Sequence, residues 1–159
     1  MIRLGKMTDY ALVLMSQIAR RSPSELHTAR DLAHECHLPL PTVSKLLKRL
    51  LSGLLASHRG IKGGYSLARE PHLISLAEII SALEGPLALT ECSTEIEGLC
   101  DLESCCPIKN NQKIISQVLR GALEKVTLSD LIRPMRLIAI RDGRGNLVPT
   151  VSVTSGRMQ

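Results

Sequence analysis

The chain has 159 residues, a formal net charge of +5 and no apolar run of the roughly eighteen residues that a membrane span requires. The N-terminal stretch MIRLGKMTDYALVLMSQIARR continues directly into a helical pattern, unlike a signal peptide. We therefore expect a cytoplasmic protein whose cysteines stay reduced unless a metal or a redox switch uses them.

Aromatic residues are scarce and charge is unevenly distributed. Phe and Trp are absent, so Tyr10 and Tyr65 are the only rings, and base stacking on single-stranded nucleic acid is disfavoured. Residues 1–73 carry eleven Lys/Arg against five Asp/Glu, residues 74–133 carry five against nine, and residues 134–159 carry four against one. A basic front half favours contact with phosphate, although an ordinary solvated surface is the alternative.

Apolar residues at helical spacing predict two helices before residue 37. Thr8 is the predicted cap of the first, whose apolar side comprises Tyr10, Ala11, Leu14, Met15 and Ile18. Thr28 is the predicted cap of the second, with Asp31 as its capping partner. The buried side of the second helix is predicted to be Leu32, Ala33 and Cys36, and Cys36 is interpreted as core packing.

A third helix is predicted to begin near Pro41, because proline suits the first turn of a helix. Its apolar residues fall on one face: Val43, Leu46, Leu47, Leu50, Leu51 and Leu54. The opposite face is polar: Thr42, Ser44, Lys45, Lys48, Arg49 and Ser52.

A β-hairpin and a fourth helix follow. Short alternating runs on either side of GIKGG predict the hairpin. Ser75 and Glu78 predict a capping box for the helix SLAEIISALEG, and Gly85 stands where a glycine stop belongs.

The rest of the chain contains a long helix and a tail. The helix is predicted from about residue 108 to 125, with one apolar side made of Ile108, Ile115, Val118, Leu119, Ala122 and Leu123. VTLSDLI predicts a short final helix. The tail, residues 134–159, has two strand-like fragments around RDGRGN and is either a loose hairpin or disordered.

Three helices followed by a hairpin is the order of a winged helix–turn–helix, so the sequence predicts a mainly α fold with a small β-hairpin wing. In that motif the third helix enters the major groove. Thr42 and Ser44 are the predicted base contacts, Lys45 lies beside them, and Lys48 and Arg49 are predicted phosphate contacts. The alternative is an ordinary amphipathic surface helix.

The predicted wing adds two cations, Arg59 and Lys62, on a turn of glycines. Small residues let the backbone approach a duplex closely, and an arginine there can enter a narrow minor groove. The sequence therefore predicts that the wing contacts DNA as well.

The stretch ECSTEIEGLCDLESCCPIKN, residues 91–110, holds four of the five cysteines, five acidic residues and one lysine. Cys92, Cys100, Cys105 and Cys106 lack the Cys-x-x-Cys pair of most structural zinc sites, although zinc tolerates other spacings. An iron–sulfur cluster suits thiolates spread over a longer loop. The neighbouring carboxylates disfavour a free thiolate nucleophile, and four thiols in fifteen residues disfavour an incidental set.

Five motifs together resemble the IscR and NsrR family of winged-helix iron–sulfur regulators, also called the Rrf-two family. They are MTDYALVLM, LPLPTVSKLLKRL, RGIKGGYSLAR, ISLAEIISALEGP and the cysteine pattern ending in CDLESCCP. The resemblance covers about residues 1–133 and is nearest to the branch that regulates the SUF iron–sulfur assembly operon, on ALEGPLALTECS and CDLE.

The resemblance implies a homodimeric transcriptional regulator that reads a pseudo-palindromic operator in double-stranded DNA. We predict a repressor, and activation is the alternative that stays open. Residues 1–84 would form the DNA-binding domain, 85–107 the cluster-binding loop, and 108–133 the dimerisation helix with a short helix after it. Residues 134–159 would form the tail. No nucleophile–base constellation or phosphate-cradling loop indicates an enzyme.

The resemblance also implies a [2Fe–2S] or [4Fe–4S] cluster held by Cys92, Cys100 and Cys106, with Cys105 as a substitute or a bystander. One branch of the family has a histidine as fourth ligand where this chain has Lys109, which cannot ligate. Another branch uses an aspartate near the N-terminus, and Asp9 matches it. A helix-dipole role in the first turn is the alternative for Asp9.

Two rival functions stay open from the sequence. The first is a winged-helix regulator that is switched by zinc or by thiol oxidation in the same loop. The second is an iron–sulfur assembly or electron-transfer partner that does not bind DNA.

Overall fold

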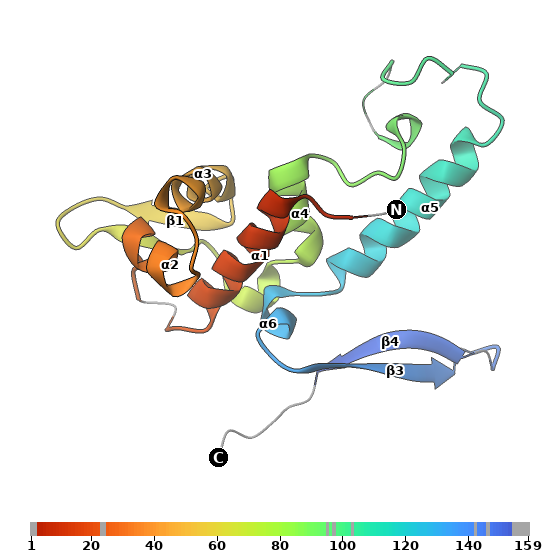
Figure 1. Ribbon diagram of the computed structural model, residues 1–159. Coiled ribbons are helices and arrows are strands. Elements are labelled where there is room, and N and C mark those ends of the chain that lie inside the picture. Colours follow the sequence, from red (N-terminus) through yellow and green to blue (C-terminus); the bar gives the residue numbers. More distant parts are fainter. Residues whose placement is uncertain are drawn as a thin grey trace.

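The computed structural model describes residues 3–22, 25–94, 96, 98–102, 104–141, 143–145 and 147–153. The elements in chain order are α1 (Lys6–Ala19), α2 (Ala29–Glu35), α3 (Leu40–Leu50), β1 (Leu55–His58), β2 (Gly64–Leu67), the 3-10 turn η1 (Pro71–Leu73), α4 (Leu76–Glu84), the 3-10 turn η2 (Glu91–Ser93), α5 (Lys109–Glu124), α6 (Leu128–Leu131), β3 (Met135–Arg141) and β4 (Leu147–Val153). The mainly α fold with a small hairpin wing is therefore confirmed, and Figure 1 shows its arrangement.

The core is aliphatic and lies between α1, α2, α3 and α4. Its fully buried large side chains include Leu14, Met15, Leu32, Leu46, Leu47, Leu50, Ile74, Ile79, Ile80 and Leu128. Each such side chain contributes roughly 1.5–3 kcal/mol relative to exposure, so the apolar face of α3 alone secures that helix to the body. Leu51 departs from its predicted place and is 37 % exposed, because α3 ends one residue before it.

Cys36 was predicted on the buried side of α2 and instead follows the last helical residue as the C-cap. Its thiol is half-buried and packs against the edge of the core. Burial and the nearby Glu35 carboxylate raise the pKa of this thiol above its ordinary value.

The predicted helix starts at Thr28 and Ser75 are confirmed. Thr28 Oγ1 accepts from the backbone N–H of Asp31, and Ser75 forms a complete capping box with Glu78. The prediction for Thr8 was wrong: α1 begins at Lys6, and Thr8 is fully buried inside its first turn. The reason is a distant partner, the Glu84 carboxylate, which accepts from the Gly5 N–H and so serves the end of α1 in place of a local cap.

The wing is the antiparallel pair β1–β2, with Leu55 opposite Leu67 and His58 opposite Gly64. A single antiparallel bridge between His27 and Tyr65 adds the segment before α2 to its edge. Gly64 has to be glycine at this edge, because an added Cβ would lie 2.8 Å from the His27 carbonyl oxygen. The wing is therefore held against the start of α2 by backbone contacts.

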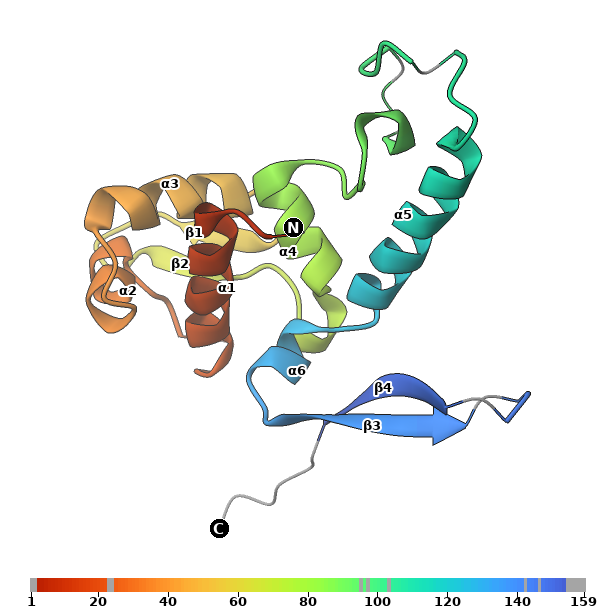
Figure 2. The ribbon, with the colours of Figure 1, turned by 45° about the vertical axis from the view of Figure 1, so that its right-hand side comes forward.

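The second half of the chain leaves this body and returns to it. Gly85 ends α4 with a φ of +89°, as the predicted glycine stop requires. The chain then passes through η2 and the cysteine segment to α5, which stands apart from α1–α3 in both orientations of the ribbon (Figures 1 and 2). It returns to the body at α6, where Leu128 is fully buried and the backbone bridges Ser75 and Thr127.

The tail forms a hairpin over the residues that the structure describes. Strands β3 and β4 pair antiparallel from Met135 opposite Val153 to Arg141 opposite Leu147. Of the two alternatives for this segment, the hairpin is the one found, and residues 154–159 lie outside the described part of the chain.

Candidate nucleic-acid interface and cysteine loop

Helix α3 turns a polar face outward because its other face is sealed in the core. Val43, Leu46, Leu47 and Leu50 have no exposed area. The predicted base contacts Thr42 and Ser44 are half-buried near the start of the helix, while Lys45 and Lys48 are exposed. The helix thus presents small hydroxyls first and cations behind them, which suits a helix entering a groove from its N-terminal end.

Arg49 has a contact within the chain that the sequence did not indicate. Its Nη1 donates to the carbonyl oxygen of Leu83 at 3.1 Å. That carbonyl belongs to the last turn of α4, where helix carbonyls lack partners inside the helix. Arg49 therefore links α3 to α4, and its predicted phosphate contact stays a prediction.

The turn of the wing is exposed and charged. Both Arg59 and Lys62 are exposed, and His58 Nε2 lies 3.0 Å from Ser66 Oγ near the turn end of the β1–β2 pair. The Gly63 N–H donates to the Gly60 carbonyl at 2.9 Å, which closes the turn. In Figure 1 the loop between β1 and β2 projects past α2, so the cations of the wing are carried beyond the helical body.

The end of α4 is a junction between the front half and the cysteine loop. The Glu84 carboxylate accepts from Gly5 N–H at 2.6 Å and from Thr8 Oγ1 at 2.5 Å. Asp9 follows Thr8 in the first turn of α1 and is exposed. The sequence missed Glu84 because its partners lie more than seventy residues away.

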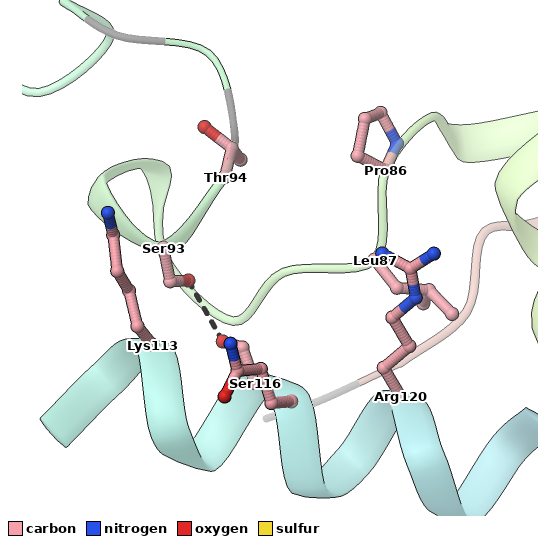
Figure 3. Close-up of a pocket in the computed structure, with 8 residues that line it drawn as sticks. Pro86, Leu87, Ser93, Thr94, Lys113, Ser116 and Arg120 are labelled. Atoms are coloured by element: carbon pink, nitrogen blue, oxygen red, sulfur yellow. Dashed lines mark hydrogen bonds between the residues drawn. The ribbon is translucent and has the colours of Figure 1, made fainter. Parts of the chain in front are cut away.

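The first cysteine is fixed against α5. Cys92 lies in η2, is 7 % exposed, and has its sulfur 3.4 Å from Thr90 Oγ1. The next residue, Ser93, accepts a hydrogen bond from Ser116 Oγ at 2.9 Å (Figure 3). Ser116 Oγ in turn accepts from the Leu89 N–H at 3.1 Å. Ser116 is the one α5 residue classed as buried in the described chain, and a lone serine in a helix gave no sequence signal for this role.

A small hollow of about 180 Å³ lies beside this contact, between residues 86–94 and α5. It is lined by Pro86, Leu87, Ser93, Thr94, Lys113, Ser116, Gln117 and Arg120. Figure 3 labels all of these except Gln117. Ser93 Oγ donates to the Thr90 carbonyl, and Ser116 Oγ donates to Ser93 Oγ. Thr94 Oγ1 donates to the carbonyls of Glu91 and Ile96. Because these hydroxyls already have partners within the chain, we interpret the hollow as a gap in the packing around the cysteine loop.

The other loop cysteines lie further out. Cys100 and Cys106 are half-buried, Cys105 is exposed, and all five cysteines of the chain are free thiols. Within the described ranges, no three His, Cys, Asp or Glu side chains come together as a metal site. The structure thus fixes the position of Cys92 but does not bring the predicted cysteine ligands together with Asp9. Of the acidic residues in the loop, Glu95, Glu97 and Glu103 lie outside the described residues.

The apolar side of α5 faces away from the body. Its large apolar side chains are exposed: Ile114 (58 %), Ile115 (47 %), Val118 (68 %) and Leu119 (39 %). Ile108, just before the helix, is 52 % exposed. The side that meets the cysteine loop is instead polar, around Ser116. A surface helix normally turns its apolar side toward the core and its polar side toward water, so the orientation of α5 is reversed. None of the helices in the described part of the chain has the length and apolar content for crossing a bilayer.

Comparisons with known proteins agree with this architecture. Residues 4–134 match the profile of the Rrf2 family, described as an iron-dependent transcriptional regulator. Among curated proteins, the regulator NsrR of Bacillus subtilis is 27 % identical over 135 residues, covering 83 % of this chain and 91 % of NsrR. The regulator IscR of Cronobacter sakazakii is 29 % identical over 146 residues, covering 91 % and 89 %.

Two solved structures share the fold. CymR, the global cysteine regulator of B. subtilis, superposes with a TM-score of 0.65 at 28 % identity, over 83 % of this chain and 97 % of CymR. IscR of T. potens gives 0.61 at 25 % identity, over 82 % and 86 %. The curated relatives NsrR and IscR are named as transcriptional regulators, in keeping with a protein that is not an enzyme. The chain belongs to the Rrf2 family of winged-helix, DNA-binding transcriptional regulators.

Proposed function

We propose that this regulator is a homodimer that senses iron–sulfur cluster status and represses genes of a SUF-type cluster assembly system. The observation that carries the proposal is the placement of the cysteine loop. It begins directly after the α4 turn that holds both α1 and α3, and it ends at the helix with the exposed apolar face.

The dimer is supported by the inverted α5. A helix that turns Ile114, Ile115, Val118 and Leu119 into water leaves a continuous apolar stripe uncovered, and association with a second copy would bury it. Such an isologous contact relates two α3 helices and two wings by a two-fold axis. Two-fold related reading elements fit a pseudo-palindromic operator.

The donor chemistry of the loop fits an iron–sulfur cluster. Cys92, Cys100 and Cys106 are free thiols on one segment, and exposed Cys105 could replace Cys106. A bound cluster would cross-link the thiolates and tie distant parts of the loop together. Asp9 is the proposed fourth ligand, since it is an exposed carboxylate on the helix turn that Glu84 holds.

The residues at the α4 end provide a route from the loop to DNA. Glu84 holds the N-terminus of α1, and the Leu83 carbonyl holds Arg49 of α3. A change in the loop that displaced this turn would shift α3 relative to the wing. A 100-fold change in affinity needs only about 2.7 kcal/mol of coupling, which is within the usual range for allostery.

The proposed DNA contacts follow from exposure and charge. Thr42, Ser44 and Lys45 lie toward the start of α3, where base edges are read. Lys48, Arg49, Arg59 and Lys62 would meet phosphates or the minor groove. The front half of the chain, which carries all of these residues, has the net positive charge this role needs.

A thiol or zinc switch is the second candidate. Cys105 and Cys106 are adjacent, and Cys105 is exposed to oxidants. A relative that is 27 % identical to this chain, CymR of Staphylococcus aureus, has a crystal structure of an oxidized form. Under this alternative the same loop would control the same junction without iron.

The experiment is an anaerobic mobility-shift assay on the gene's own promoter, with cluster-loaded protein, apo protein and a Cys92→Ala variant. Loaded and apo protein should differ in affinity by about 100-fold, and Cys92→Ala should behave as apo in both preparations. Cys36→Ala is the matched control, because Cys36 lies at the end of α2, outside the loop. Colourless protein that holds one zinc per chain, or equal affinity of both forms, would contradict the proposal.

A further inference from the structure

Ile61 stands at the tip of the wing with its side chain entirely in water. Its relative exposed area is 108 %, against 68 % for Val118, the next most exposed large apolar side chain among the described residues. Single exposed apolar residues are common on protein surfaces, so exposure alone assigns no role. The place of Ile61 in the wing turn is what sets it apart.

The turn has a constrained backbone with Ile61 at its corner. The hydrogen bond from Gly63 N–H to the Gly60 carbonyl makes Ile61 and Lys62 the two central residues of a four-residue turn. Gly60 has a φ of +120°, and a Cβ on Gly63 would lie 2.3 Å from the His58 carbonyl oxygen. Turn corners favour Asn, Asp, Ser, Gly or Pro, and no packing within this turn requires isoleucine.

Two cations flank Ile61 and determine what it would meet on DNA. Arg59 and Lys62 are both exposed and would be drawn to the phosphates that border a groove. A turn held at that border presents its corner residue to the sugar rings and base edges inside the groove. Proteins that bind the minor groove use isoleucine and other apolar side chains against this surface.

We propose that Ile61 makes an apolar contact in the minor groove of the operator, which adds salt-independent affinity and a preference for A·T pairs beneath the wing. The inference rests on the wing contact with DNA described under the proposed function. The preference arises because a G·C pair adds the guanine N2 amino group to the minor groove. Ile61 would bury that donor without offering it an acceptor.

The first test separates the apolar contact from charge. Full-length protein is titrated, across a range of salt concentrations, with a duplex that the wild type selects from a random pool. Ile61→Ser should weaken binding about tenfold at every salt concentration with an unchanged salt slope, and Ile61→Leu should restore most of the affinity. Lys62→Ala should instead flatten the slope by about 0.9, the effect of one lost phosphate contact.

The matched control is Leu73→Ser, since Leu73 is 54 % exposed but belongs to η1 instead of the wing. It should bind DNA as the wild type does. Wild-type affinity in Ile61→Ser, or the same loss in Leu73→Ser, would overturn the inference. Because Ile61 makes no core contact, circular dichroism should show unchanged folding in Ile61→Ser.

The second test identifies the groove. Replacing A·T pairs under the wing with G·C should weaken wild-type binding, and inosine·C, which lacks the amino group, should restore it. Ile61→Ser should lose this discrimination. Inosine·C that binds as poorly as G·C would overturn the minor-groove assignment. If the wild type selects no duplex from the random pool, the DNA interface itself is contradicted. If the wild type selects a duplex and Ile61→Ser binds it equally well, only this inference is contradicted.

Discussion

Thr8, which is buried in the first turn of α1, and Glu84, in the last turn of α4, form a hydrogen bond of 2.5 Å. The same carboxylate also accepts from the Gly5 N–H at 2.6 Å. One side chain thus joins the start of the chain to the point from which the cysteine loop departs. We expect Glu84→Ala to lower the free energy of unfolding by about 1–3 kcal/mol, because it leaves the buried Thr8 hydroxyl unpaired. Urea denaturation measures this difference.

The control for Glu84 is Glu124→Ala. Glu124 makes an exposed pair with Arg120 on α5, so its loss should cost at most about 1 kcal/mol. Adding Thr8→Val to Glu84→Ala should cost little more, because the partner has already gone. Equal stabilities of the two single variants would show that the junction does not stabilise the fold.

Arg49 and Lys48 are neighbours on α3 with different expected roles. Arg49→Ala removes the hydrogen bond to Leu83 and should lower both the free energy of unfolding, by about 1 kcal/mol, and DNA affinity. Lys48→Ala should leave stability unchanged and reduce the salt slope of binding by about 0.9. Thermal melts and salt-dependent binding assays distinguish the two. Matching melting temperatures would argue that the Arg49 contact contributes nothing.

Ser116 should govern the order of the cysteine loop. Ser116→Ala deprives the Leu89 N–H of its acceptor and Ser93 of a donor, at a cost of about 1–3 kcal/mol. Hydrogen exchange at Leu89 should become correspondingly faster. Gln117→Ala, an exposed neighbour on the same helix, should leave that exchange rate as it is. Slow exchange in Ser116→Ala would place the restraint on the loop elsewhere.

The exposed face of α5 should determine the oligomeric state. Val118→Glu puts a charge at the centre of that face and should convert the proposed dimer to a monomer, because an unpaired charge cannot be buried there. Light scattering after size-exclusion chromatography measures the mass. Leu73→Glu, at a comparably exposed site outside α5, should stay dimeric. A dimeric Val118→Glu would show that the copies meet through another surface.

Local patterns predicted most of the front half. The side-chain cap at Thr28 and the capping box at Ser75 need partners only three residues away, and the buried face of α3 follows from its spacing alone. The cap of α1 could not be predicted in this way, because Glu84 lies 76 residues from Thr8. Periodicity located the apolar side of α5 but gives no information about which side meets the body, and here the contact through Ser116 decides it.

The cysteine loop shows the same limit. Composition predicted a site for thiolate ligands, and that stays a prediction. The buried position of Cys92 depends on the hydroxyl contact between Ser93 and Ser116, which composition does not reveal. Spacing along the chain cannot tell whether Asp9 approaches Cys100 or Cys106, since that depends on the path of the loop in space.

The most direct measurement is operator affinity as a function of iron and sulfide content in one anaerobic preparation, which is loaded in steps and then stripped with a chelator. We expect affinity to follow cluster content, with a change of about 100-fold between the extremes that reverses on stripping. An affinity that stays constant while iron content rises and falls, or a protein that takes up no iron, would contradict cluster sensing and leave a DNA-binding regulator that responds to another signal.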